Sequence, residues 1–189
     1  MLKIVGGKHR GRTLATPEGL ATRPTSSRAR EALFNILAHA NWRSDGTSPL
    51  LGARVLDAFA GSGALGMEAL SRGAAHATFL DNDAAAIKLI GDNLRKLGEV
   101  AAAKVVRADV PRPPLAREGC DLAFLDPPYR SGLATPALAA LGEAGWFKPG
   151  AVVTVELGNT EDLVPPDGFA AIDERRYGAA KIMILRYTR

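Results

Sequence analysis

The sequence of 189 residues holds few of the residue types that build disulfides and metal sites, with Cys120 as its only cysteine. One cysteine cannot form a disulfide within the chain, and it excludes a cysteine-rich zinc site. His9, His39 and His76 lie far apart without the spacing of metal ligands, so we expect no bound metal. No apolar run is long enough to span a membrane, and the N-terminal residues lack the apolar segment of a signal peptide. We therefore expect a cytoplasmic protein without a membrane partner.

Positive charge is concentrated at the N-terminal end of a chain whose net charge is +4. Residues 1–43 hold eight Lys and Arg against two Glu, a net charge of +6, which leaves −2 for residues 44–189. Clustered basic side chains bind polyanions, because they neutralise phosphates and release counterions. On charge alone, a nucleic-acid partner and a plain solvated surface are equally good interpretations.

From residue 53 onward, short apolar strands, such as residues 76–81 and 150–156, alternate with helical patterns, such as residues 84–97. This alternation is typical of α/β proteins in which a parallel sheet is covered on both faces. The closing segment, residues 169–187, predicts two antiparallel strands that meet at a tight turn around Gly178. We expect a mostly parallel seven-stranded sheet closed by an antiparallel C-terminal hairpin, over residues 52–189.

A small extension precedes this body. Residues 1–24 mix short β-like runs with glycines and prolines and predict a hairpin. Apolar residues from Ala29 to Ala40 recur at spacings of three and four, which predicts one amphipathic helix. We expect residues 1–43 to form this hairpin-plus-helix extension.

Four predicted strands end in an acid: Asp57, Asp81, Asp109 and Asp126. Ligands of open α/β sheets bind beyond the carboxyl ends of the strands. A single acid there is ordinary turn chemistry. Four at equivalent positions favour a shared site.

A glycine-rich loop, Gly61-x-Gly63-x-x-Gly66, follows the first of these strands and opens a helix. This is the context of a loop that binds a nucleotide-type cofactor. Asp81, twenty residues beyond Gly61, can accept hydrogen bonds from both hydroxyls of a ribose. The pattern alone fits a dinucleotide dehydrogenase as well as any other enzyme with an adenosine-containing cofactor.

Three features favour S-adenosylmethionine. Asp57 would repel a pyrophosphate but attract a cationic amino group. Asp109 is suited to accept a hydrogen bond from an adenine amino group. The segment Asp126–Tyr129, with the sequence DPPY, supplies groups for holding a base that hydride transfer does not need.

The prolines of the DPPY segment fix its backbone and lack N–H groups. The Pro127 carbonyl and the Asp126 carboxylate are then two acceptors, which match the two hydrogens of an exocyclic amino group. Tyr129 offers a ring on which the base can stack. Holding both hydrogens would offset the positive charge that develops on the nitrogen as a methyl group arrives. The segment therefore predicts methyl transfer to an amino group, of guanine or of adenine.

These residues resemble the class I methyltransferases with a Rossmann-like fold that act on exocyclic amino groups. Nearly the whole chain is similar to the RsmD-type 16S ribosomal RNA guanine-N2 methyltransferases, through IVGGKHRGRTL, RPTSSRAREALFNIL, VLDAFAGSGALGMEALSRGA, FLDPPY and RRYG. The resemblance implies transfer of a methyl group from S-adenosylmethionine to guanine N2 in the 16S ribosomal RNA of the small subunit or its assembly intermediate.

The resemblance also implies roles for individual residues. The cofactor pocket would hold Asp57, Phe59, Ala60, Gly61, Gly63, Asp81, Asn82 and Asp109. The catalytic residues holding the guanine would be Asp126, Pro127, Pro128 and Tyr129. Contacts to the RNA backbone would come from Lys8, Arg10, Arg12, Arg23 and Arg28. Asp81 stands where the family more often has Glu, and TSSRARE lacks the family's usual acid after the threonine.

Several alternatives stay open. An adenine-N6 methyltransferase of DNA or RNA would hold its amino group in a similar way. An NAD-dependent oxidoreductase would use the same glycine loop, and a noncatalytic RNA-binding assembly factor would keep the basic extension. Glu156, at the end of the fifth strand, is equally well interpreted as a fifth site acid and as a structural cap. We expect a monomer from the size of the chain.

Overall fold

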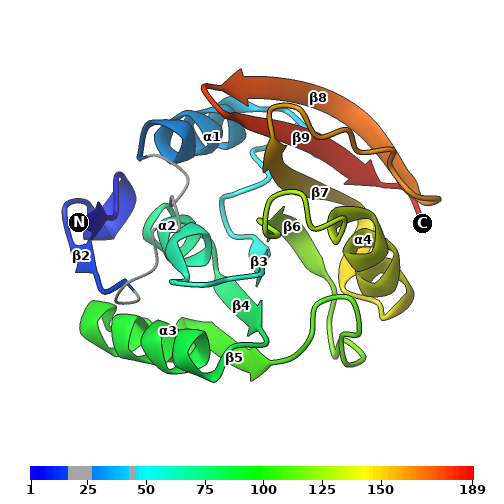
Figure 1. Ribbon diagram of the computed structural model, residues 1–189. Coiled ribbons are helices and arrows are strands. Elements are labelled where there is room, and N and C mark those ends of the chain that lie inside the picture. Colours follow the sequence, from blue (N-terminus) through cyan, green and yellow to red (C-terminus); the bar gives the residue numbers. More distant parts are fainter. Residues whose placement is uncertain (17–26, 43–45) are drawn as a thin grey trace.

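The computed structural model of the chain describes residues 1–16, 27–42 and 46–189 (Figure 1). Its helices and strands are β1 (Leu2–Lys3), β2 (Thr13–Leu14), α1 (Ser27–His39), β3 (Arg54–Ala58), α2 (Ala64–Ser71), β4 (His76–Asp81), α3 (Ala84–Leu97), β5 (Ala103–Arg107), β6 (Cys120–Leu125), α4 (Ala134–Glu143), β7 (Phe147–Gly158), β8 (Phe169–Tyr177) and β9 (Ala180–Tyr187), with 3-10 turns η1 (Gly7–His9) and η2 (Val100–Ala102). Within these ranges, no helix combines the length and the apolar character needed to cross a membrane.

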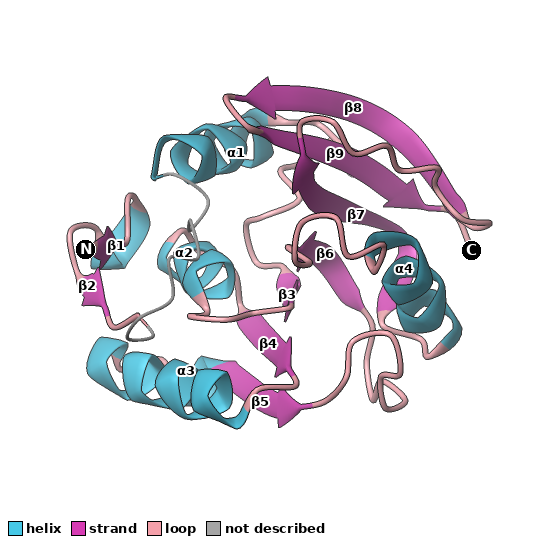
Figure 2. Cartoon of the chain, in the orientation of Figure 1, coloured by secondary structure: helices cyan, strands magenta, loops and turns pink. Residues whose placement is uncertain are grey.

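The main sheet has the strand order β5-β4-β3-β6-β7-β9-β8. Strands β3 to β7 run parallel, and β9 lies antiparallel between β7 and β8. Strands β1 and β2 form a separate antiparallel hairpin, followed in the described chain by α1 (Figure 2). The predicted parallel sheet and its antiparallel closure are confirmed, and so are a hairpin and a helix in the N-terminal extension, while residues 17–24 of the predicted hairpin and Arg43 lie outside the described residues. The order reverses between β3 and β6, and such a switch point is where open α/β sheets bind ligands.

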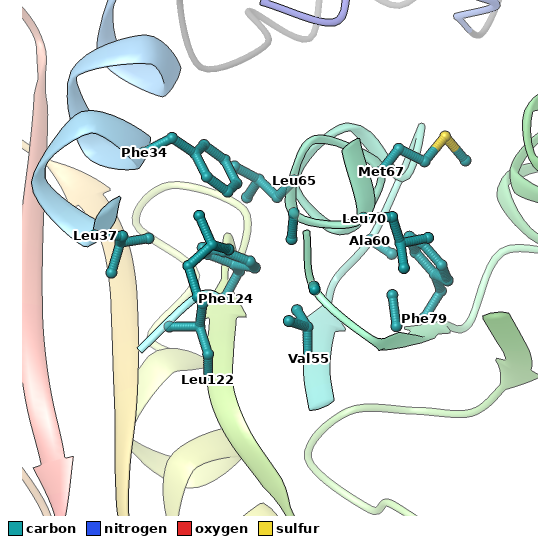
Figure 3. Close-up of a cluster of buried hydrophobic side chains, with 14 of the residues drawn as sticks. Phe34, Leu37, Val55, Ala60, Leu65, Met67, Leu70, Phe79, Leu122 and Phe124 are labelled. Carbon is teal, nitrogen blue, oxygen red and sulfur yellow. The ribbon is translucent and has the colours of Figure 1, made fainter. Parts of the chain in front are cut away.

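Each face of the sheet carries its own hydrophobic cluster. On one face, Phe34 of α1 packs against Phe124 of β6 with ring centroids 5.3 Å apart, beside Leu65 and Leu70 of α2 (Figure 3). Side chains of α3 belong to the same cluster. On the other face, α4 places Leu138 and Leu141 in a second cluster. Neighbouring strand residues such as Val55 and Leu56 belong to different clusters. The central strands are largely apolar because both faces of the sheet are covered.

Glu68 of α2 connects this helix to the N-terminal hairpin, and its side chain is fully buried. The Glu68 carboxylate accepts hydrogen bonds from the Val5 N–H at 2.8 Å and from Arg72 Nε at 2.7 Å. Arg30 of α1 is also buried, with its Nε 3.8 Å from the same carboxylate. Buried charges persist only when they are paired. This cluster therefore fixes the hairpin and α1 against the helix that follows the glycine loop.

Candidate active site

Three carboxylates gather where β3, β6 and β7 approach their carboxyl ends. Asp57 is the penultimate residue of β3, Asp126 follows β6 directly, and Glu156 lies near the end of β7. Leu125 is in register with Val155, so Asp126 and Glu156 are the next positions of neighbouring strands. The three acids therefore meet at the switch point of the sheet.

The surroundings of Asp57 and Asp126 oppose the ionisation of these two carboxyls. Asp57 is 1% exposed, and burial raises the pKa of its carboxyl to about 8 despite a hydrogen bond from the Gly66 N–H at 2.8 Å, with the nearby charge of Asp81 adding to the effect. Burial also raises the pKa of Asp126 well above its ordinary value, and the charges of Glu156 and Asp57 raise it further. A bound cation or amino group beside them would favour the ionised forms.

The glycine loop turns through left-handed backbone conformations. Phe59, Gly61 and Gly63 have φ angles of 60°, 53° and 76°. The Ala60 N–H donates to a backbone carbonyl of β4 at 3.0 Å. The Gly61 N–H donates to the Asp81 carboxylate at 2.7 Å. The loop that follows β3 is therefore hydrogen-bonded to the end of β4, and Asp81 orients this loop.

Gly66 lets α2 approach the sheet closely. A Cβ atom at Gly66 would lie 2.4 Å from the Phe79 ring on β4 and 3.2 Å from the Asp57 side chain. This is the packing role of the third glycine in nucleotide-binding loops. The close approach also brings the Gly66 N–H to Asp57.

The remaining predicted cofactor residues are more open. Asn82 is exposed, and its carbonyl accepts a hydrogen bond from Arg107 Nε at 3.1 Å. Asp109 is exposed two residues beyond the end of β5, and its carboxylate lies 4.0 Å from Arg112 Nε. The structure thus gathers Asp57, Asp81 and the glycine loop but leaves Asn82 and Asp109 at the surface, and a cofactor role for all of these residues stays a prediction.

The predicted base-holding segment is anchored at its tyrosine. The Asp126 N–H donates to the Ala58 carbonyl at 3.4 Å, and Pro127 is buried. Tyr129 is 46% exposed, but its hydroxyl donates to the Glu156 carboxylate at 2.8 Å. Partial burial and this hydrogen bond raise the pKa of the Tyr129 hydroxyl, which therefore stays protonated. Glu156 thus lies in the acid cluster and also holds the tyrosine.

The sequence analysis did not identify Glu161 or Asn93. Glu161, in the turn after β7, accepts hydrogen bonds from the backbone N–H groups of Arg130 at 2.7 Å and Gly158 at 2.6 Å. The first contact joins residues 31 positions apart. No local pattern marks such a contact, although an acid in a turn after a strand that ends at the site is a usable signal.

Asn93 of α3 is buried and joins the N-terminal extension to the glycine loop. Its side-chain oxygen accepts from the Ala15 N–H at 2.8 Å, and its amide nitrogen donates to the carbonyls of Ala15 at 3.1 Å and Ser62 at 3.2 Å. The extension and the loop are therefore held by one side chain.

Two of the basic residues predicted to contact RNA already have partners within the chain. Lys8 Nζ lies 2.6 Å from the Glu99 carboxylate, and Arg12 donates to the Lys96 carbonyl at 2.9 Å. Arg10 is exposed. The other two predicted contacts are Arg23, which lies outside the described residues, and Arg28, whose side chain does too. In the part of the chain that is described, no group of acids, histidines or cysteine is arranged to hold a metal ion.

A model of the family described as "Conserved hypothetical protein 95" matches residues 2–186. The chain belongs to this family. It is 40% identical to ribosomal RNA small subunit methyltransferase D of Escherichia coli (strain K12) over 157 residues, which cover 82% of this chain and 74% of the relative. The family resemblance seen in the sequence is thereby confirmed.

Solved structures confirm the fold of this family member. The Escherichia coli protein yhhF superposes with a TM-score of 0.81 at 34% identity, covering 99% of this chain and 98% of that one. An RNA methyltransferase of Salinibacter ruber, in complex with S-adenosyl-L-homocysteine, superposes with a TM-score of 0.64 at 12% identity, covering 87% of this chain and 94% of that one. The predicted class I methyltransferase fold is therefore confirmed.

Proposed function

We propose that the protein transfers a methyl group from S-adenosylmethionine to the exocyclic N2 of a guanine in small-subunit ribosomal RNA. The observation that carries the proposal is the position of Asp126 and Pro127. Their two acceptors directly follow β6 at the switch point, and Asp126 is close enough to Asp57, beneath the glycine loop, for the two charges to interact. A base amino group and a cofactor can meet there.

The described residues fit S-adenosylmethionine, which supplies a methyl group on a cationic sulfonium. Burial raises the pKa of Asp57, and a cationic ligand group beside it would favour its ionised form. Asp81 would hold the ribose hydroxyls, because each of its oxygens accepts a single backbone N–H, from Gly61 or Asp83, and retains a further lone pair. A Cβ at Gly61 would meet no atom closer than 4.0 Å, so the space over this turn is open to a ligand.

The chain's own groups would prepare the amino nitrogen for methylation. The lone pair of a base amine is delocalised into the ring, which makes the nitrogen a poor nucleophile. Acceptance of both hydrogens by Asp126 and Pro127 localises that pair. The hydrogen bond from the amino group favours the ionised form of Asp126, whose charge then offsets the positive charge that develops on nitrogen. Tyr129, with its hydroxyl held by Glu156, would present its ring for stacking.

Two observations support an RNA substrate: the name of a relative and the positive charge of the N-terminal extension. The relative at 40% identity is named a ribosomal RNA small subunit methyltransferase. The net charge of +6 on residues 1–43 suits an RNA backbone. We propose this extension as the RNA-binding part, residues 52–189 as the catalytic domain, and a cytoplasmic monomer acting on 16S ribosomal RNA in the small subunit or an assembly intermediate.

The Asp126→Ala variant tests the mechanism. We expect methyl transfer to fall by about a thousandfold or more, because one acceptor and the compensating charge are both lost. Affinity for S-adenosylmethionine, measured by calorimetric titration, should change by less than about threefold. Asp167→Ala, which removes a carboxylate that is 99% exposed, is the matched control and should keep full activity. Full activity of Asp126→Ala would contradict the mechanism, and tight binding of NAD to the native protein would favour an oxidoreductase.

A further inference from the structure

Arg130, the residue after the DPPY segment, has an unusual backbone conformation. Its φ angle is 57°, and it shares a left-handed conformation with only one other non-glycine residue of the described chain, Phe59 in the glycine loop. A side chain makes this region unfavourable, and residues other than glycine keep it only when their surroundings impose it. Both outliers lie in loops at the switch point. The strain at Arg130 therefore requires a local cause.

Glu161 supplies that cause. One of its carboxylate oxygens accepts the Arg130 N–H at 2.7 Å, and the other accepts the Gly158 N–H at 2.6 Å. Hydrogen bonds from backbone N–H groups to a carboxylate are charge-assisted and strong. The carboxylate thus joins the exit of the base-holding segment to the last residue of β7.

Glu161 is itself held in place by the sheet. Its N–H donates to the Gly158 carbonyl at 2.9 Å, and Gly158 pairs with Ala180 of β9. A Cβ at Gly158 would lie 2.7 Å from the Glu161 carboxylate, so glycine leaves room for the contact. The support for Arg130 therefore comes from a rigid strand end.

We propose that Glu161 is a positioning residue for methyl transfer. By holding Arg130 in its left-handed turn, Glu161 fixes the segment Asp126–Tyr129 from its C-terminal side, while the hydroxyl contact to Glu156 fixes the tyrosine within it. The inference rests on the proposed function and assigns Glu161 no contact with base or cofactor.

The kinetic test uses tritiated S-adenosylmethionine and small ribosomal subunits from cells that lack the gene. We expect Glu161→Ala to lower kcat about tenfold or more while KM for S-adenosylmethionine stays within about twofold, and Glu161→Gln to lie between this variant and the native protein. Adding Arg130→Gly to Glu161→Ala should restore kcat about fivefold, because glycine adopts a left-handed conformation freely. Glu143→Ala, on the exposed end of α4, is the matched control and should keep native kcat.

A second readout does not require activity. Trypsin cleaves after arginine, and release of the Arg130 backbone should make cleavage at Arg130 about fivefold faster in Glu161→Ala, but not in Glu143→Ala. Gly158→Ala keeps the glutamate but displaces its carboxylate, so it should reproduce both effects if Glu161→Ala does not fold.

The outcomes separate this inference from the proposed function. Absence of methyl transfer by the native protein would refute the proposed function, while trypsin would still decide whether Glu161 holds the segment. Native kcat in Glu161→Ala, or failure of Arg130→Gly to restore it, would overturn the positioning role. Unchanged cleavage at Arg130 would show that Glu161 does not hold the backbone of Arg130 in place.

Discussion

At the scale of single residues, the site depends on carboxyl groups that are costly to ionise. Asp57 is buried and receives one N–H hydrogen bond, from Gly66. Its raised pKa means that, without a cationic group beside it, the carboxyl favours the neutral form near neutral pH. Binding of a cationic ligand group would ionise it, so cofactor binding and proton release should be coupled.

Asp57→Asn should change how stability depends on pH. The carboxyl has a pKa of about 8 in the folded chain and about 4 when unfolded, so the folded state binds the proton more tightly between these values. Native stability is therefore lost as pH rises through this window, whereas asparagine does not titrate and can still accept the Gly66 N–H. We expect the stability of Asp57→Asn relative to the native protein to rise by ~3–5 kcal/mol from pH 4 to pH 8.

Urea unfolding without cofactor at several pH values measures this difference. A difference that stays constant over the whole range would show that Asp57 has an ordinary pKa and is not buried as described. S-adenosylmethionine should also bind more weakly to Asp57→Asn, because the favourable charge interaction is lost.

The sequence predicts the acids that the structure gathers at the candidate site but not the residues that support them. Asp57, Asp81 and Asp126 follow from their position near strand ends, and the glycine loop follows from its spacing. Glu161 and Asn93 act through contacts between residues 31 and 78 positions apart, respectively, which depend on how the turns and the extension pack. The sequence left the role of Glu156 open, and the structure shows that its carboxylate accepts a hydrogen bond from the Tyr129 hydroxyl.

At the scale of secondary structure, hydrophobic periodicity predicts the residue ranges of helices and strands closely where these elements have clear boundaries. Strand β4 and helix α3 match the predicted ranges 76–81 and 84–97. Strand β7 is longer than predicted, since it begins at Phe147 and passes through a proline and a glycine. An irregular register between Cys120 and Leu122 of β6 accommodates this stretch, and proline is tolerated at such bulges.

The Asn93→Ala variant tests the link between α3, the extension and the glycine loop. It would leave the polar backbone groups of Ala15 and Ser62 without their buried partner. We expect a loss of stability of ~2–4 kcal/mol in urea unfolding, together with weaker cofactor binding. Asp92→Ala is the control on the same helix, because its ion pairs with Lys88 and Arg95 are exposed, and it should cost much less stability than Asn93→Ala. Equal effects of the two variants would contradict the link.

At the scale of the whole molecule, the extension and the sheet share one core. Leu2, Ile4 and Leu14 of the hairpin belong to the same cluster as Val55 and Phe79 of the sheet. The alternation of strands and helices predicted the sheet and its closure, but not that the extension packs on the helices beside the glycine loop. That arrangement depends on buried polar partners such as Glu68 and Asn93, which periodicity does not reveal. The proposed RNA-binding part is therefore built directly against the proposed cofactor site.

The most direct test of the central claim is to locate the methyl group. The native protein is incubated with labelled S-adenosylmethionine and small ribosomal subunits that lack the modification, and the labelled nucleotide is then identified by mass spectrometry. We predict labelling of a guanine at N2 in the 16S ribosomal RNA, and none with Asp126→Ala. A label on adenine N6 would contradict the assignment of the base, and the absence of any label in the RNA would contradict the proposed function.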